Sequence, residues 1–176
     1  MIKFKNNLLI KNIIILLVSG AVAKVIGMVG KIIYTRAAGV NVVSLYTLIT
    51  PTFMLLITIC QFSFQISISK LSAENKYDNK KLLITAYAIG FIIDIIPFIT
   101  ISSIQRGFLH GKENMLPSSI TNITEEIIKI ILIIIFLPLA VSKSNIHAVI
   151  AIVIFNIFTE ISSILIMQKS IKKYVK

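Results

Sequence analysis

Lysines and glycines near the amino terminus combine positive charge with small size at a spacing that suits one helix face. Lys24 and Lys31 alternate with Gly20, Gly27 and Tyr34 at intervals of three and four residues. At about 100° per residue, these positions fall on one narrow stripe of a helix. Glycines on such a stripe let another backbone or a ligand come close, and the ammonium groups offer charge to an anion. The stripe therefore predicts a cationic binding surface.

The element that must carry this stripe is the apolar stretch 12–38, which is long enough to cross a bilayer. Lys24, Lys31 and Arg36 lie inside it or at its far end. An ammonium group at mid-membrane costs at least about 2.5 kcal/mol. We therefore expect these three side chains to face an internal cavity filled with water or an anion. The alternative is that Lys24 extends toward the interface while Lys31 and Arg36 mark the outer interface.

The residues at the amino terminus allow one more interpretation. Lys3, Lys5, the apolar run and Ala21-Val-Ala23 resemble a secretory signal with its cleavage site. Later stretches are equally apolar, however, and the chain has no soluble domain to export. We therefore favour a membrane helix whose basic amino-terminal end lies in the cytoplasm, because cytoplasmic flanks are rich in Lys and Arg.

Composition indicates a multi-pass protein of the cell (plasma) membrane. Of the 176 residues, 56% are hydrophobic and 14% charged, and the mean hydropathy is +0.93. The net charge is +11, but the basic residues lie in short connectors and at the two ends. That pattern indicates control of topology and contact with anionic membrane lipids, and no nucleic-acid partner is expected. The single cysteine, Cys60, allows no disulfide framework or zinc spacing, and we expect no cofactor.

The apolar stretches predict an all-α, polytopic membrane helical bundle that forms a single domain over 1–176, with four to six membrane segments. The expected segments are about 12–38, 45–71, 82–105, 117–140 and 146–167.

The third segment is long enough for one crossing and too short for two. A single crossing would put the basic carboxyl-terminal tail outside, in which case the chain would be a damaged version of a longer protein. A re-entrant hairpin broken near Asp94 and Pro97 would instead keep most Lys and Arg residues on the inner face. The charge rule therefore favours an even number of crossings.

Acidic side chains inside the segments are candidates for ion coupling or for neutralising the lysines. Asp94 lies in the middle of the third segment, Glu125 and Lys129 lie four residues apart in the fourth, and Glu160 lies in the last. A Glu and a Lys at this spacing can pair on one helix face, so a salt bridge between Glu125 and Lys129 is at least as good an interpretation. The sequence contains no nucleophile–base pair and no metal cluster, so we expect neither catalytic residues nor a bound metal.

Several motifs, taken in order, resemble those of one family. They are Lys24-Val-Ile-Gly27, Tyr34-Thr-Arg36-Ala-Ala-Gly39, Gln105-Arg106-Gly107 with Asn114-Met115-Leu-Pro117 after it, and Glu125-Glu126-Ile-Ile-Lys129. Over nearly its whole length the chain resembles the stage V sporulation protein B group. That group belongs to the polysaccharide biosynthesis (oligosaccharide flippase) family of the multidrug/oligosaccharidyl-lipid/polysaccharide flippase superfamily.

The resemblance implies a fold and a function. Family members have two similar helical bundles, so this chain would be about half of a two-bundle flippase fold, and it would need a second copy or another half-unit as its partner. The cavity between the bundles would carry a lipid-linked glycan, a polyprenyl pyrophosphate derivative, across the membrane for the cell envelope. Lys24, Lys31 and Arg36 would then bind the phosphates. Two other functions stay open: a multidrug/cation antiporter of the same superfamily, and a non-transporting truncated remnant or assembly subunit.

Overall fold

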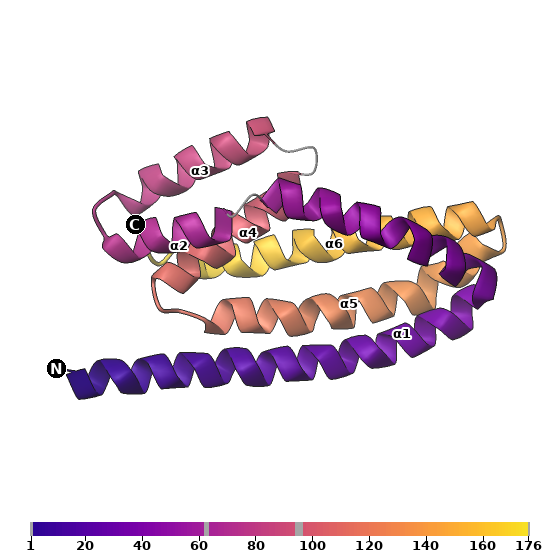
Figure 1. Ribbon diagram of the computed structural model, residues 1–176, viewed down its shortest axis with the longest axis horizontal. Coiled ribbons are helices and arrows are strands. Elements are labelled where there is room, and N and C mark those ends of the chain that lie inside the picture. Colours follow the sequence, from indigo (N-terminus) through magenta and orange to yellow (C-terminus); the bar gives the residue numbers. More distant parts are fainter. Residues whose placement is uncertain (1, 62–63, 94–96, 176) are drawn as a thin grey trace.

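The computed structural model describes residues 2–61, 64–93 and 97–175. All regular secondary structure in these ranges is helical (Figure 1). The helices are α1 (Ile2–Gln61), α2 (Phe64–Glu74), α3 (Asn79–Ile93), α4 (Pro97–Gly111), α5 (Leu116–Val141) and α6 (Asn145–Ile171). The predicted all-α bundle is therefore confirmed. Two stretches, Ile10–Leu55 and Asn145–Ile171, are long and apolar enough to cross a membrane.

Helix α1 consists of two arms that reverse direction at Gly39 (Figure 1). Gly39 has φ 76° and ψ 165°, a conformation that a residue with a Cβ rarely adopts. The linker between the first two predicted segments, 39–44, is thus helical apart from this one residue. We call 2–38 the first arm of α1 and 40–61 its second arm.

The bend of α1 packs against the hairpin formed by α5 and α6. Tyr34, Ala38 and Val42 from the two arms lie in one buried cluster with Leu137 of α5 and Ile152 of α6. The Ser144 hydroxyl caps the start of α6 by accepting a hydrogen bond of 3.2 Å from the backbone N–H of Ile146. Apolar burial at this end therefore holds both arms of α1 on the hairpin.

The third predicted segment, 82–105, consists of two antiparallel helices, α3 and α4 (Figure 1). Each has 15 residues, which gives a length of about 22 Å, less than the roughly 30 Å of a bilayer's hydrocarbon core. The expected break at Asp94 lies outside the described residues, and α4 begins at Pro97. Entry of this hairpin into a membrane and return to the same side stays a prediction.

Two glycines bring α4 close to α2. A Cβ at Gly107 would meet the backbone carbonyl oxygen of Gln65, and a Cβ at Gly111 would meet that of Ser69. The two glycines are four residues apart and therefore lie on one helix face, the small-residue pattern that lets membrane helices approach closely. Ser72 adds a hydrogen bond of 3.2 Å from its hydroxyl to the carbonyl oxygen of Phe108.

The chain runs back and forth along one long axis, so both termini lie at the same end (Figure 1). The α2–α3 turn and the α4–α5 turn lie at that end too, whereas the Gly39 bend and the α5–α6 turn lie at the other. This arrangement has the even number of passes that the charge distribution favoured. Which end faces the cytoplasm stays a prediction.

Candidate functional site

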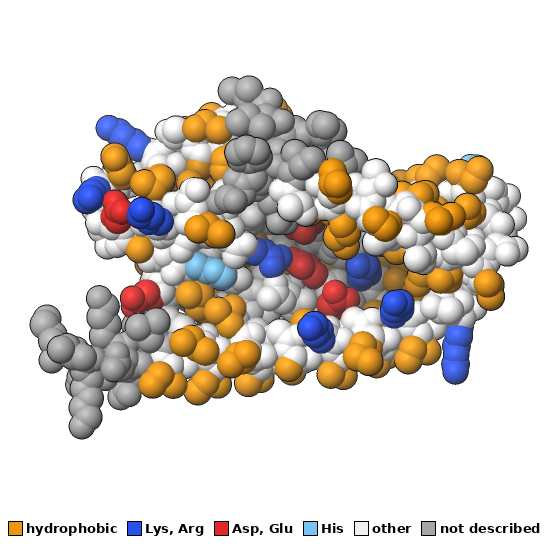
Figure 2. Space-filling model, in the orientation of Figure 1, with side chains coloured by type: hydrophobic (Ala, Val, Ile, Leu, Met, Phe, Trp, Pro, Cys, Tyr) orange, Lys and Arg blue, Asp and Glu red, His pale blue; other side chains and the backbone are white. Residues whose placement is uncertain are grey.

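A charged furrow lies between the first arm of α1 and helix α5. Figure 2 shows Lys, Arg, Asp and Glu side chains gathered along a hollow on this face of the molecule. Two adjoining cavities of about 480 and 460 Å³ make up the furrow, and they share Gly27, Lys31 and Glu126. The other residues that line the first cavity are Gly20, Ala23, Lys24, Met28, Asn122 and Glu125.

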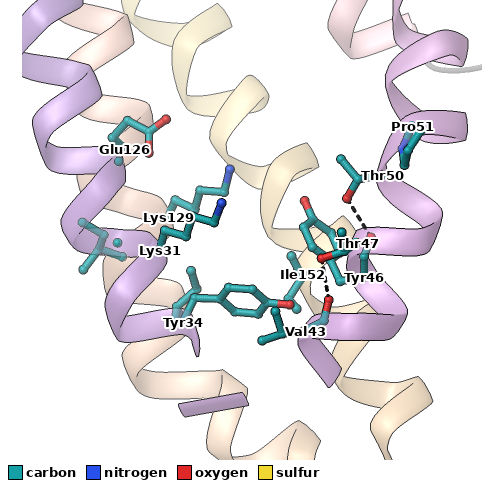
Figure 3. A pocket seen from close by; sticks show the side chains of 14 residues that line it. Lys31, Tyr34, Val43, Tyr46, Thr47, Thr50, Pro51, Glu126, Lys129 and Ile152 are labelled. Carbon is teal, nitrogen blue, oxygen red and sulfur yellow. Dashed lines mark hydrogen bonds between the residues drawn. The ribbon is translucent and has the colours of Figure 1, made fainter. Parts of the chain in front are cut away.

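Two lysines meet in the second cavity. Figure 3 shows Lys31 from α1 and Lys129 from α5 with their ammonium groups directed into the same space, below Glu126. Among the described residues, the ion pairs within 4.0 Å are Lys76–Glu74 and Arg106–Glu125, so neither lysine has a carboxylate at that distance. This end of the cavity therefore presents two cations beside one carboxylate.

The rest of the second cavity combines hydroxyl groups with an apolar wall. Tyr34 and Tyr46, from the two arms of α1, make an edge-to-face contact with ring centroids 5.7 Å apart. The Tyr34 side chain is 8% exposed, and its hydroxyl has no hydrogen-bond partner among the described groups. A buried hydroxyl without a partner costs free energy, so this donor suits an acceptor on a bound ligand. The apolar wall consists of Val43, Pro51, Ile130, Ile133 and Ile152.

The glycine stripe is what lets α5 approach α1. A Cβ at Gly27 would lie 3.1 Å from a carboxylate oxygen of Glu126, and a Cβ at Gly30 would lie 2.9 Å from Cγ1 of Ile130. A Cβ at Gly20 would meet nothing within 4 Å. The stripe identified in the sequence thus faces α5, and it places Glu126 against the backbone of α1.

The structure brings together some of the predicted site residues and separates others. Lys24 and Lys31 line the furrow, as does Lys129. Arg36 is exposed and lines neither cavity. Asp94 lies outside the described residues, and Glu160 lies among α4, α5 and α6, away from the residues that line the furrow.

Arg106 forms an ion pair that sequence reasoning missed. Its guanidinium group donates to a carboxylate oxygen of Glu125 and, at 2.6 Å, to the side-chain oxygen of Asn122. The Ser163 hydroxyl donates to the same Glu125 oxygen. The expected pair between Glu125 and Lys129 was therefore wrong, because Glu125 turns toward α4 and α6 and Lys129 turns into the cavity. About a fifth of each side chain in the Arg106–Glu125 pair is exposed (19% and 21%).

Arg106 was expected in a polar connector, where it would shape a turn. It lies instead four residues before the last residue of α4, on the face that meets α5. The spacing from Arg106 to Glu125 follows no helical repeat, because the two residues lie on different helices. The one available signal was an arginine next to an apolar stretch, which needs an internal partner if it does not face water.

An all-helical bundle that keeps charged side chains in a furrow between apolar helices has the features of a membrane protein that handles polar cargo. The comparisons with known proteins make this class specific. A family model described as polysaccharide biosynthesis protein matches residues 9–96, which is half of the chain, and the chain belongs to that family. It is a flippase-like membrane protein.

Two proteins of Bacillus subtilis (strain 168) are similar to the chain. Stage V sporulation protein B is 29% identical over 171 residues, which cover 73% of this chain and 33% of that protein. Sporulation protein YkvU is 27% identical over 164 residues, which cover 74% of this chain and 36% of that protein. The chain thus spans about a third of the length of the curated relatives it matches. No solved structure matches the chain significantly.

Proposed function

We propose that the furrow binds the anionic headgroup of a lipid-linked oligosaccharide or polysaccharide precursor, as part of a flippase that moves such precursors across the cell membrane. The two lysine side chains that share one cavity, Lys31 and Lys129, are the observation that carries this proposal. Each ammonium group is a strongly hydrated point charge that suits a phosphate. Lys24, in the adjoining cavity, extends the cationic surface along α1.

The remaining lining suits the other parts of such a molecule. The hydroxyl groups of Tyr34, Tyr46, Thr47 and Thr50 can pair with phosphate or sugar oxygens. The apolar wall opposite suits the first isoprene units next to the headgroup. Glu126 beside the lysines keeps the empty cavity from holding only positive charge, and it can accept hydrogen bonds from sugar hydroxyls.

A binding experiment tests this assignment. Native mass spectrometry of the purified chain in detergent would compare a polyprenyl diphosphate with the matching uncharged polyprenol. We expect the diphosphate to bind more tightly. We expect the double variant Lys31→Ala/Lys129→Ala to lose about tenfold or more in affinity, because a charge-assisted hydrogen bond contributes about 1.5–3 kcal/mol.

Arg36→Ala is the matched control, since it removes a cation that lies outside both cavities. Equal binding of diphosphate and polyprenol, or an unchanged affinity in the double lysine variant, would contradict the proposal. An affinity loss in the Arg36 variant alone would show that the phosphates lie nearer the Gly39 bend. Preferential binding of a lipophilic organic cation would favour the antiporter function instead.

The partner implied by the family resemblance is a second copy of the chain or another half-unit, and it stays a proposal. Crosslinking in membranes tests it. A crosslinked dimer in which Lys31→Cys reacts with a residue of the second copy would support a shared furrow. A monomer that is quickly degraded would favour the truncated remnant.

A further inference from the structure

Two glutamates in the middle of the bundle have different surroundings. Glu125 of α5 accepts hydrogen bonds from the Arg106 guanidinium group and from the Ser163 hydroxyl. Both donors supply a proton, and one of them is a cation, so Glu125 is satisfied as an ionised carboxylate. Glu160 of α6 belongs to neither ion pair of the described chain.

The neighbour of Glu160 is a serine that already has an acceptor. One carboxyl oxygen of Glu160 lies 2.6 Å from the Ser102 hydroxyl oxygen. The same hydroxyl oxygen lies 3.1 Å from the backbone carbonyl oxygen of Ile99. A serine hydroxyl has one proton to donate and can also accept. The Ile99 carbonyl can only accept, so if Ser102 donates to Ile99, the proton in the short contact must come from Glu160.

An ionised Glu160 would leave this network short of one proton. The Ser102 proton would have to be shared between a carboxylate and a carbonyl oxygen, at a residue that is 3% exposed. A carboxylic acid at Glu160 gives every oxygen a partner, because Glu160 donates to Ser102 and Ser102 donates to Ile99. Burying a carboxylate without a cation costs several kcal/mol, which the neutral form avoids.

The charged groups that face Glu160 come from each helix packed on it. Helix α4 contributes Arg106, and helix α5 contributes Glu125 and Lys129. The Arg106 charge is neutralised by Glu125, and Lys129 points into the furrow. Helix α1 meets α6 through the apolar cluster that contains Tyr34. The surroundings therefore supply no direct counter-ion for a carboxylate at Glu160.

We propose that Glu160 is a proton-binding site in the interior of the bundle, protonated at neutral pH and hydrogen-bonded to Ser102. Its deprotonation releases one proton to water and leaves one negative charge beside the Arg106–Glu125 pair. That charge competes with Glu125 for the Arg106 guanidinium group. Proton binding at Glu160 thus controls the ion pair at the edge of the furrow. The proposal rests on the hydrogen-bond geometry and does not depend on the transported substrate.

Infrared difference spectroscopy of the purified chain in lipid nanodiscs tests this site directly. The carbonyl stretching band of a protonated carboxylic acid should be present at pH 7 in the wild type and absent in Glu160→Gln. It should persist in Glu125→Gln and in Glu113→Gln, which removes an exposed carboxyl group in the α4–α5 turn. Absence of the band in the wild type at pH 7, or its persistence in Glu160→Gln, would overturn the proposal.

Ser102→Ala provides a second measurement that keeps Glu160 in place. Without the hydroxyl acceptor, the Glu160 band should shift in frequency, whereas the same spectrum in Ser102→Ala and wild type would overturn the role of Ser102. The spectra are recorded without lipid-linked substrate. A failure of the headgroup-binding experiment would therefore leave this result unaffected, and the reverse also holds.

Discussion

At the scale of single residues, charge inside an apolar helix was the feature that the sequence disclosed best. Lys24 and Lys31 could be assigned to a furrow because the cost of a cation in lipid leaves few other places for them. The partner of Glu125 could not be assigned, because Arg106 reaches it from another helix. Helical spacing predicts neighbours on one helix, and it says nothing about which side chain meets them from the next one.

Removing Arg106 should destabilise the bundle. Arg106→Leu leaves the Glu125 carboxylate without its cation, which costs about 2–3 kcal/mol, at or just below the range for a fully buried pair because each side chain is about a fifth exposed. The double variant Arg106→Leu/Glu125→Leu should recover at least half of that loss, because no unpaired charge remains. Urea unfolding in detergent, followed by circular dichroism, measures both. A double variant no more stable than the single one would show that the pair is not what holds these helices.

His110 should make stability depend on pH. It lies in the last turn of α4, outside the predicted membrane segments, with its ring nitrogens 3.5 Å from the Gln65 side-chain nitrogen and 3.2 Å from the Ser118 hydroxyl. Burial, together with the nearby Arg106 charge, lowers the pKa of His110 below its ordinary value of 6.5. The folded state therefore binds a proton less readily than the unfolded state. Its contribution to stability is complete above pH 6.5 and is lost as pH falls toward the lower pKa of the folded state.

The measurement is the unfolding midpoint in detergent between pH 7.5 and about pH 5, the range in which an ordinary histidine gains its proton. The drop in the midpoint toward low pH should be smaller in His110→Gln than in the wild type. His147→Gln is the control, because His147 is exposed at the start of α6. An identical pH dependence in His110→Gln and the wild type would exclude His110 as its source.

At the scale of helices, the ends of α5 and α6 were predicted to within a few residues, whereas the third segment was not resolved into two helices. Segments 117–140 and 146–167 became Leu116–Val141 and Asn145–Ile171, because Pro117 and Ser144 mark where helices start. For 82–105, the apolar run continues through the link between α3 and α4, so hydropathy alone gives one segment. The proline at 97 was the one local sign of a new helix start.

The close contact between α2 and α4 should depend on the two glycines of α4. Gly107→Ala places a methyl group against the backbone carbonyl oxygen of Gln65, which cannot move aside without shifting α2. We expect a loss of about 1–3 kcal/mol in the free energy of unfolding, the usual cost of overpacking. Gly111→Ala, against the Ser69 carbonyl oxygen, should have a similar effect.

Gly20→Ala is the matched control, because a Cβ there meets nothing within 4 Å and alanine favours the helix. We expect it to be neutral or slightly stabilising in the same unfolding assay. Equal effects of Gly20→Ala and Gly107→Ala would mean that the loss comes from helix propensity or lipid contact and not from the α2–α4 interface.

At the scale of the whole molecule, the distribution of charge and the path of the chain agree. The sequence favoured an even number of crossings, because 13 of the 18 Lys and Arg residues then share one side. In the structure, both termini, the α2–α3 turn and the α4–α5 turn lie at one end of the bundle (Figure 1). The count could be favoured without knowing the path, because positive charge records sidedness independently of how each segment packs. The furrow could not be derived that way, because it depends on which helix lies beside α1.

The last prediction concerns how the chain is oriented in the membrane. Cys60 is the one cysteine of the sequence, so a Cys60→Ser background allows single cysteines to be placed at exposed positions. Lys76→Cys in the α2–α3 turn and Lys172→Cys after α6 should react with a membrane-impermeant maleimide from the same side. Lys143→Cys in the α5–α6 turn should react from the opposite side. The cluster of Lys residues at the first end makes that side cytoplasmic, so Lys76→Cys and Lys172→Cys should be labelled in inverted vesicles and Lys143→Cys in intact cells. Labelling of Lys76→Cys and Lys172→Cys from opposite sides would mean an odd number of crossings, and the α3–α4 hairpin would then have to open into a single crossing.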